Sequence, residues 1–267
     1  MVKKLLKHEL LSYLHTLPFV YIVLLGAALM GRCARFFEST SAGYMALNTA
    51  FTTALWLGSF AAVLLTVLFC IVRFYRNLFG KEGYLTLALP VGEGQHLFTK
   101  LIGAVVANIT TILVIVLSFH VFYAGEWTVE IWKSVAHMLG RLREDMGGQM
   151  WLYMAELLLL TLVSTAAGML TYYLCICIGQ TARRGRIIIA IVIYYGLSLL
   201  LQTALILLYL AYGAYYEELR PLMDWIDHHP YVFTHLLFCG GAVIHGLWGA
   251  VCFALSRRIM RRKLNLN

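Results

Sequence analysis

The chain has 267 residues, of which 61% are hydrophobic and 13% are charged. Soluble domains are about 45–50% apolar and about 25% charged, so this chain has too few charges to cover a water-exposed surface. Its hydrophobicity also excludes intrinsic disorder. Six cysteines in a chain of this length are too few for a disulfide scaffold.

Long stretches of the sequence contain no Asp, Glu, Lys or Arg. They cover 10–31, 39–72, 101–125, 157–182, 187–216 and 228–256. Each exceeds the roughly 20 residues that a helix needs to cross the hydrocarbon core. They are continuously apolar, whereas the strands of a membrane barrel alternate. We therefore predict an all-α integral membrane protein. Its six transmembrane helices should lie at approximately 17–37, 49–72, 101–123, 150–178, 187–212 and 232–256, within one transmembrane domain over 17–258.

The connections between these spans differ sharply in charge. The N-terminus, 73–100, 179–186 and the C-terminal tail together hold 15 of the 21 Lys and Arg residues, with only three acids. The other connections hold six basic residues and nine acids. Lys and Arg are concentrated in cytoplasmic loops, so both termini are predicted to be cytoplasmic, with a basic tail at 259–267. The net charge of +8 thus reflects an excess of Lys and Arg on one side of the membrane. No nucleic-acid partner is expected, because the chain has no basic soluble domain.

The first 16 residues have a helical hydrophobic period. Leu6, Leu10, Tyr13, Leu14 and Leu17 recur on one helix face, and Lys3, Lys4 and Lys7 lie off it. This pattern predicts an amphipathic interfacial helix over 1–16 that precedes an uncleaved first span. The alternative is that these residues simply extend the first transmembrane helix.

Two connections on the predicted outer side also have amphipathic spacing. Residues 126–148 place apolar side chains at helical intervals and end at two glycines. We expect a helix that rests on the outer leaflet or caps the bundle. Residues 213–231 predict a short amphipathic or re-entrant element around Pro221.

The longest predicted cytoplasmic connection runs from Arg73 to Lys100. At 28 residues it is too short for a catalytic domain. Its Leu85, Leu87 and Leu89 must be buried against something, and the candidates are the membrane surface and another protein.

The segment Glu82–Val91, followed by Lys100, resembles the first cytoplasmic loop of ABC-2 type transporter permeases. The shared pattern is an acidic residue and a glycine, a Leu-rich stretch, Pro with a small apolar residue, and a Lys opening the third helix. The number of spans, the N-terminal helix and the cytoplasmic termini also resemble that family. The amphipathic segment 126–148 departs from it.

The resemblance implies a permease subunit of an ATP-driven exporter in a bacterial plasma membrane. The loop would hold a coupling helix that docks on an ABC ATPase subunit, present in two copies beside a second permease, identical or related. The residues that match the family pattern are Glu82, Gly83, Leu85, Leu89, Pro90 and Lys100. The cargo would be hydrophobic or amphipathic: a peptide, a lipid or a drug. The alternative is that the loop only folds on the membrane surface.

The sequence contains no Gly-x-x-x-x-Gly-Lys-Ser/Thr phosphate loop. The chain is therefore not expected to hydrolyse ATP alone, and the resemblance implies a transport subunit that is not an enzyme and binds no cofactor directly. ATP and Mg would be held by the partner ATPase.

A few titratable residues lie within or beside the apolar spans. Glu156, His120, His235 and His245 are candidates for a substrate path, because ionisable groups in a membrane often have a function. A snorkelling carboxylate and histidines hydrogen-bonded within the bundle are the structural alternatives. Metal-ligand chemistry is present in Asp224, Asp227, His228 and His229, but such a polar loop is usually solvated, and no metal site is expected.

Three other functions stay open: an ion- or proton-coupled small transporter, an intramembrane enzyme that uses buried histidines, and a membrane sensor or scaffold.

Overall fold

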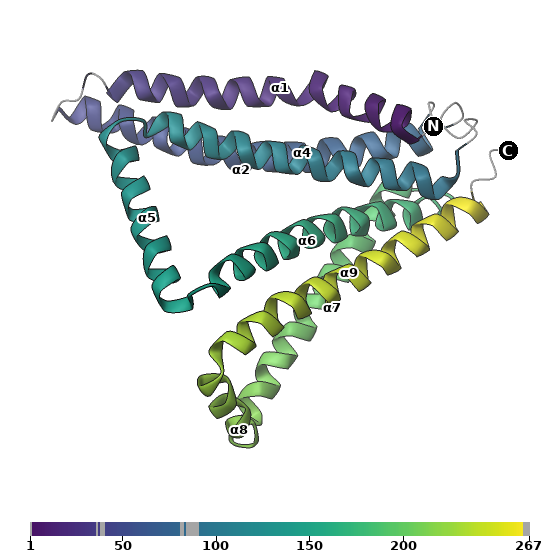
Figure 1. Ribbon diagram of the computed structural model, residues 1–267. Coiled ribbons are helices and arrows are strands. Elements are labelled where there is room, and N and C mark those ends of the chain that lie inside the picture. The colour runs from purple at the N-terminus through teal and green to yellow at the C-terminus, as the bar shows by residue number, and fades with distance from the viewer. Residues whose placement is uncertain (1, 36, 38–40, 81–82, 84–90, 264–267) are drawn as a thin grey trace. The chain divides into compact units, whose positions relative to one another are not determined.

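The computed structural model describes residues 2–35, 37, 41–80, 83 and 91–263. All regular elements in these ranges are α-helices (Figure 1). They are α1 (Val2–Arg35), α2 (Ala42–Phe79), α4 (Glu93–Phe122), α5 (Glu126–Met146), α6 (Gln149–Gly179), α7 (Arg186–Ala214), α8 (Tyr216–His228) and α9 (Pro230–Lys263).

Six of these helices are long and apolar enough to cross a membrane: α1, α2, α4, α6, α7 and α9. The shortest, α7, has 29 residues, and the longest, α2, has 38. At 1.5 Å per residue they are about 44–57 Å long, which exceeds the roughly 30 Å hydrocarbon core. The six-helix prediction is confirmed within the described residues, and it is compatible with a multi-pass membrane protein.

The two remaining helices are shorter and amphipathic. α5 has 21 residues and lies where the sequence predicts a helix in 126–148. α8 has 13 residues and contains Pro221. Pro221 has no N–H to donate to the Glu217 carbonyl, so one hydrogen bond of this helix is missing.

α1 runs without interruption from Val2 to Arg35, with Pro18 inside it. A separate interfacial helix over 1–16 is therefore not shown, and these residues form the first turns of the first long helix. Tyr13 and Leu17 of the predicted apolar face are buried, but Leu14 is 65% exposed. The buried face instead continues through Leu24 and Ala28.

The chain forms two compact units. The first consists of Met1–Asn77 and Leu89–Gly148, and the second of Leu78–Ala88 and Gln149–Asn267. The described residues Gly80 and Gly83 of the connection between α2 and α4 belong to the second unit. The expected single domain over 17–258 stays a prediction.

The core of the first unit is built from α1, α2 and α4. Its buried centre contains Leu24, Ala28, Leu55, Ala62 and Phe122. A Cβ added to Gly31 would lie 2.3 Å from the Phe122 ring, so this glycine permits the close approach of α1 and α4. Small residues at such crossings are typical of membrane helices, whose association depends on close packing rather than on expulsion of water.

In the second unit α6 packs on α9 and on α7. Ala167 and Tyr173 of α6 are buried, as are Ala242 and Cys252 of α9. Polar contacts join the same helices: the Trp248 indole donates to the Thr171 hydroxyl at 3.0 Å, and the hydroxyls of Tyr172 and Tyr194 lie 3.2 Å apart. α7 contributes no buried residue, so this helix is exposed on most of its surface.

Candidate functional site

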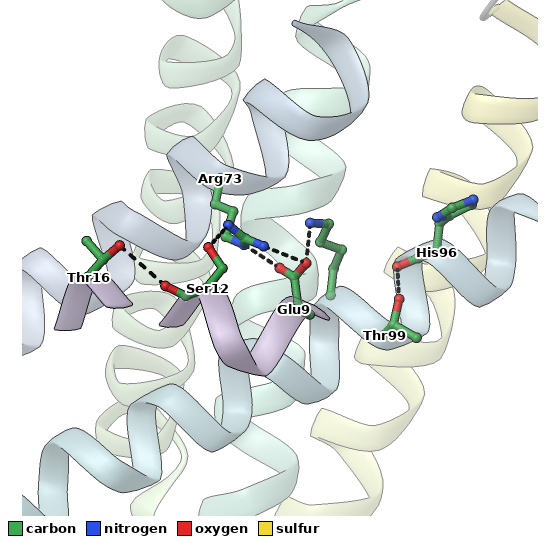
Figure 2. A network of polar contacts seen from close by, with 7 residues as sticks. Glu9, Ser12, Thr16, Arg73, His96 and Thr99 are labelled. Atoms are coloured by element: carbon green, nitrogen blue, oxygen red, sulfur yellow. Dashed lines mark hydrogen bonds and ion pairs between the residues drawn. The ribbon is translucent and has the colours of Figure 1, made fainter. Parts of the chain in front are cut away.

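A buried ion cluster joins three helices of the first unit (Figure 2). The Glu9 carboxylate of α1 accepts two hydrogen bonds from Arg73 of α2, at 2.8 and 3.1 Å. It accepts a third from the Lys100 ammonium of α4, at 2.6 Å. The Arg73 guanidinium also donates to the Ser12 hydroxyl. The side chains of Lys100 and Glu9 are only 5% and 7% exposed, and that of Arg73 is 17% exposed.

The close approach of α1 and α4 at this cluster depends on Gly103. A Cβ added to Gly103 would lie 2.8 Å from the Tyr13 ring and 3.0 Å from Cγ of Glu9. The Tyr13 ring is held edge-on against Phe69, with 5.6 Å between ring centroids. Any larger residue at position 103 would push α1 away from Lys100.

The ions of this cluster depend strongly on one another. A two-point contact between guanidinium and carboxylate is the strongest common ion-pair geometry. One carboxylate is here shared by a guanidinium and an ammonium group. Removing one partner of a buried pair typically costs about 3–5 kcal/mol, because the remaining charge is left uncompensated. Glu9 is therefore the residue on which the local packing of three helices depends.

The cluster lies at both ends of the connection that the sequence analysis singled out. Arg73 precedes the end of α2 by six residues, and Lys100 follows the start of α4 by seven. A single carboxylate thus ties together the two helices from which residues 80–92 emerge.

Of the residues that match the coupling-loop pattern, Gly83 and Lys100 are described. Glu82, Leu85, Leu89 and Pro90 lie outside the described residues. The Gly83 N–H donates to the Gly80 carbonyl at 2.9 Å. A Cβ added to Gly83 would lie 2.6 Å from the Leu78 carbonyl oxygen, so only glycine fits this turn without a backbone shift.

A second polar cluster joins α6 and α9 in the second unit. Nδ1 of His235 lies 2.9 Å from both carboxylate oxygens of Glu156. The Cys239 thiol donates to the same carboxylate at 3.5 Å. The Tyr153 ring stacks on the imidazole with 4.2 Å between centroids, and its hydroxyl donates to the Tyr231 carbonyl at 3.0 Å.

This pair differs from the Glu9 cluster in the kind of charge it contains. Within the described residues, the ion-pair partner of Glu156 is an imidazole and not a guanidinium or an ammonium group. His235 lies 22 residues before Arg257 on α9, which is about 33 Å of helix. This length is comparable with the roughly 30 Å thickness of a hydrocarbon core.

The other two histidines of the predicted substrate path lie elsewhere. The His120 ring of α4 faces the Trp132 ring of α5 at 6.2 Å in the first unit. Nδ1 of His245 donates to the Gly241 carbonyl of its own helix at 2.8 Å. Neither has a described contact with the Glu156–His235 pair. The structure thus brings together two of the four predicted residues.

The sequence analysis did not single out Glu9, Arg73 or His96. Glu9 was detectable as the only acid before Glu38 in a basic N-terminal segment. Its partners Arg73 and Lys100 were not detectable, because they lie 64 and 91 residues away in the sequence. His96 lies one turn before Lys100 and is only 1% exposed, and its ring nitrogens bond to no described residue.

No protein-family model, curated protein or solved structure matches this chain. Its function must therefore be argued from its own residues.

Proposed function

We propose that this chain is the membrane-spanning subunit of an ABC-2 type, ATP-driven exporter. The observation that supports it most is the Glu9–Arg73–Lys100 cluster, which joins α2 and α4 to α1 beside the connection 80–92. A force applied to that connection would move three packed helices together. A coupling loop needs to be attached to helices that move together, because the closure of two ATPases must become a rigid-body movement of the permease.

The remaining parts of the proposal follow from the sequence. The chain lacks a phosphate loop, so ATP and Mg belong to two copies of a separate ATPase subunit. A second permease, identical or related, completes the transporter. The cargo is a hydrophobic or amphipathic peptide, lipid or drug, exported across a bacterial plasma membrane with both termini in the cytoplasm.

Co-purification in mild detergent tests the proposal. Tagged wild-type protein should carry an ATPase subunit with it. Glu82→Arg or Leu85→Asp should weaken that complex and leave the helical content unchanged. The matched control is Glu130→Gln on the exposed face of α5, which should retain the ATPase. Full retention by both loop variants, or absence of an ATPase from the wild type, would refute the coupling-loop assignment.

The Glu156–His235 pair favours one other function, an ion- or proton-coupled transporter. Contacts between carboxylate and histidine side chains occur in the proton relays of pumps and transporters. Transport in liposomes separates the two functions, because a proton-coupled transporter is driven by a pH gradient alone. Transport that requires the ATPase and ATP, and that survives Glu156→Gln, excludes this second function.

A further inference from the structure

A cavity of about 520 Å³ lies at the C-terminal end of α9. Among the described residues, its lining consists of Phe253, Ala254, Arg257, Arg258 and Arg261. Four of these positions, 254, 257, 258 and 261, recur at the spacing of a single helix face. We call Arg257, Arg258 and Arg261 with Phe253 and Ala254 the arginine face of α9.

The arginine face points away from the packed side of its helix. The buried residues of this region are Cys252, Ser256 and Met260, which recur every four residues. All three arginines are exposed. The arginine face is therefore open to whatever surrounds the second unit, and it does not support the packing of α9 on α6.

The positive charge on this face has no counter-charge in the described structure. α9 contains no Asp or Glu along its whole length. Within residues 2–35, 37, 41–80, 83 and 91–263, none of the three arginines forms an ion pair or a hydrogen bond. Three guanidinium groups within five residues repel one another, so an external anion would stabilise them.

The position of the arginine face along α9 matches the depth of a lipid headgroup. Residues 230–256 carry no Asp, Glu, Lys or Arg, and they span about 40 Å of helix. The arginines follow at once and extend over about 6 Å, which is close to the thickness of one headgroup layer. Phe253 and Ala254 lie on the hydrocarbon side of them.

We propose that the arginine face binds an anionic phospholipid of the adjoining leaflet. The guanidinium groups hold the phosphate by charge-assisted hydrogen bonds, for which their planar fork is well suited. Phe253 and Ala254 contact the first carbons of the acyl chains. A free phosphate would use only the cationic part of this cavity, and a zwitterionic lipid would place a further positive charge beside the three arginines. This proposal goes beyond the transport function and does not depend on an ATPase.

Native mass spectrometry of the full chain in a neutral detergent tests this site. Phosphatidylglycerol and phosphatidylcholine are added at equal concentrations, and the bound lipids are counted. The wild type should retain more phosphatidylglycerol than phosphatidylcholine. One basic residue near an anionic lipid surface contributes about fivefold in affinity. The triple variant Arg257→Gln, Arg258→Gln, Arg261→Gln should therefore bind on the order of a hundredfold more weakly.

The matched control removes three arginines elsewhere in the second unit. Arg183, Arg184 and Arg186 are exposed at the turn before and the start of α7, and replacing them by Gln changes the net charge equally. This control should retain phosphatidylglycerol. Ala254→Glu, which places a carboxylate among the intact guanidinium groups, should weaken binding and decides the question if the triple variant cannot be purified.

Three results would overturn the proposal. Equal loss in both triple variants would show diffuse electrostatic attraction without a site. Equal retention of the two lipids would exclude selectivity for an anionic headgroup. Displacement of the lipid by equimolar inorganic phosphate would show that the site recognises a phosphate group and not a phospholipid.

Discussion

Glu9→Gln is the sharpest test of how the first unit is held together. The substitution keeps the length of the side chain and one acceptor oxygen, but it removes the only carboxylate that faces Arg73 and Lys100 within the described cluster. Lys100 is 5% exposed, so its ammonium group would lose the Glu9 carboxylate in a buried setting. The expected loss is about 3–5 kcal/mol of unfolding free energy.

The loss can be measured by thermal unfolding in detergent. Cys70, Cys175, Cys177 and Cys252 are buried, so a thiol-reactive fluorescent dye reports the exposure of these cysteines as the protein unfolds. For a chain of this size, 3–5 kcal/mol lowers Tm by on the order of 10 °C. The control Glu130→Gln changes an exposed acid in the same unit and should shift stability by less than about 0.5 kcal/mol.

A second variant distinguishes charge balance from the mere loss of a contact. Lys100→Met removes one cation and leaves a neutral Glu9–Arg73 pair, so it should destabilise the protein less than Glu9→Gln does. Equal destabilisation by the two variants would refute the charge-balance reasoning. A Tm of Glu9→Gln within 2 °C of wild type would refute the importance of the cluster itself.

Two glycines provide the remaining predictions. Gly103→Ala places a Cβ 2.8 Å from the Tyr13 ring and should lower the unfolding free energy by about 1–3 kcal/mol in the same thermal assay. The control is Gly246→Ala, because the nearest atom to its Cβ would lie 3.8 Å away. This control should leave Tm within a degree or two of wild type. Gly83→Ala forces a backbone shift in the connection between α2 and α4. It should reduce ATPase co-purification at unchanged Tm, while Gly92→Ala, with no atom within 4 Å of its Cβ, should retain the ATPase fully; equal retention by both would contradict the need for glycine at position 83.

The elements that could be predicted from the sequence are those that local chemistry determines. A run of more than 20 residues without a charge, such as 187–216, forms a helix in lipid whatever its neighbours are, because each backbone group must be paired within the segment. The amphipathic helix in 126–148 was also predictable from local sequence, because its hydrophobic period is visible within one short stretch. The continuity of α1 past residue 16 was not predictable from periodicity, because the same apolar face fits both a separate interfacial helix and the first turns of the span.

The pairing of polar groups between helices was decided by the tertiary structure alone. Glu9 reads as one acid among N-terminal lysines, yet its partners come from α2 and α4, and the approach of α1 to Lys100 requires a glycine at position 103. Glu156 and His235 were each candidates for a substrate path, but only the packing of α6 on α9 brings them into contact. His245 bonds instead to the Gly241 carbonyl of its own helix. Hydropathy and charge determine which segments enter the membrane. Which side chains then meet depends on helix rotation and close contact, and one sequence read segment by segment does not contain that information.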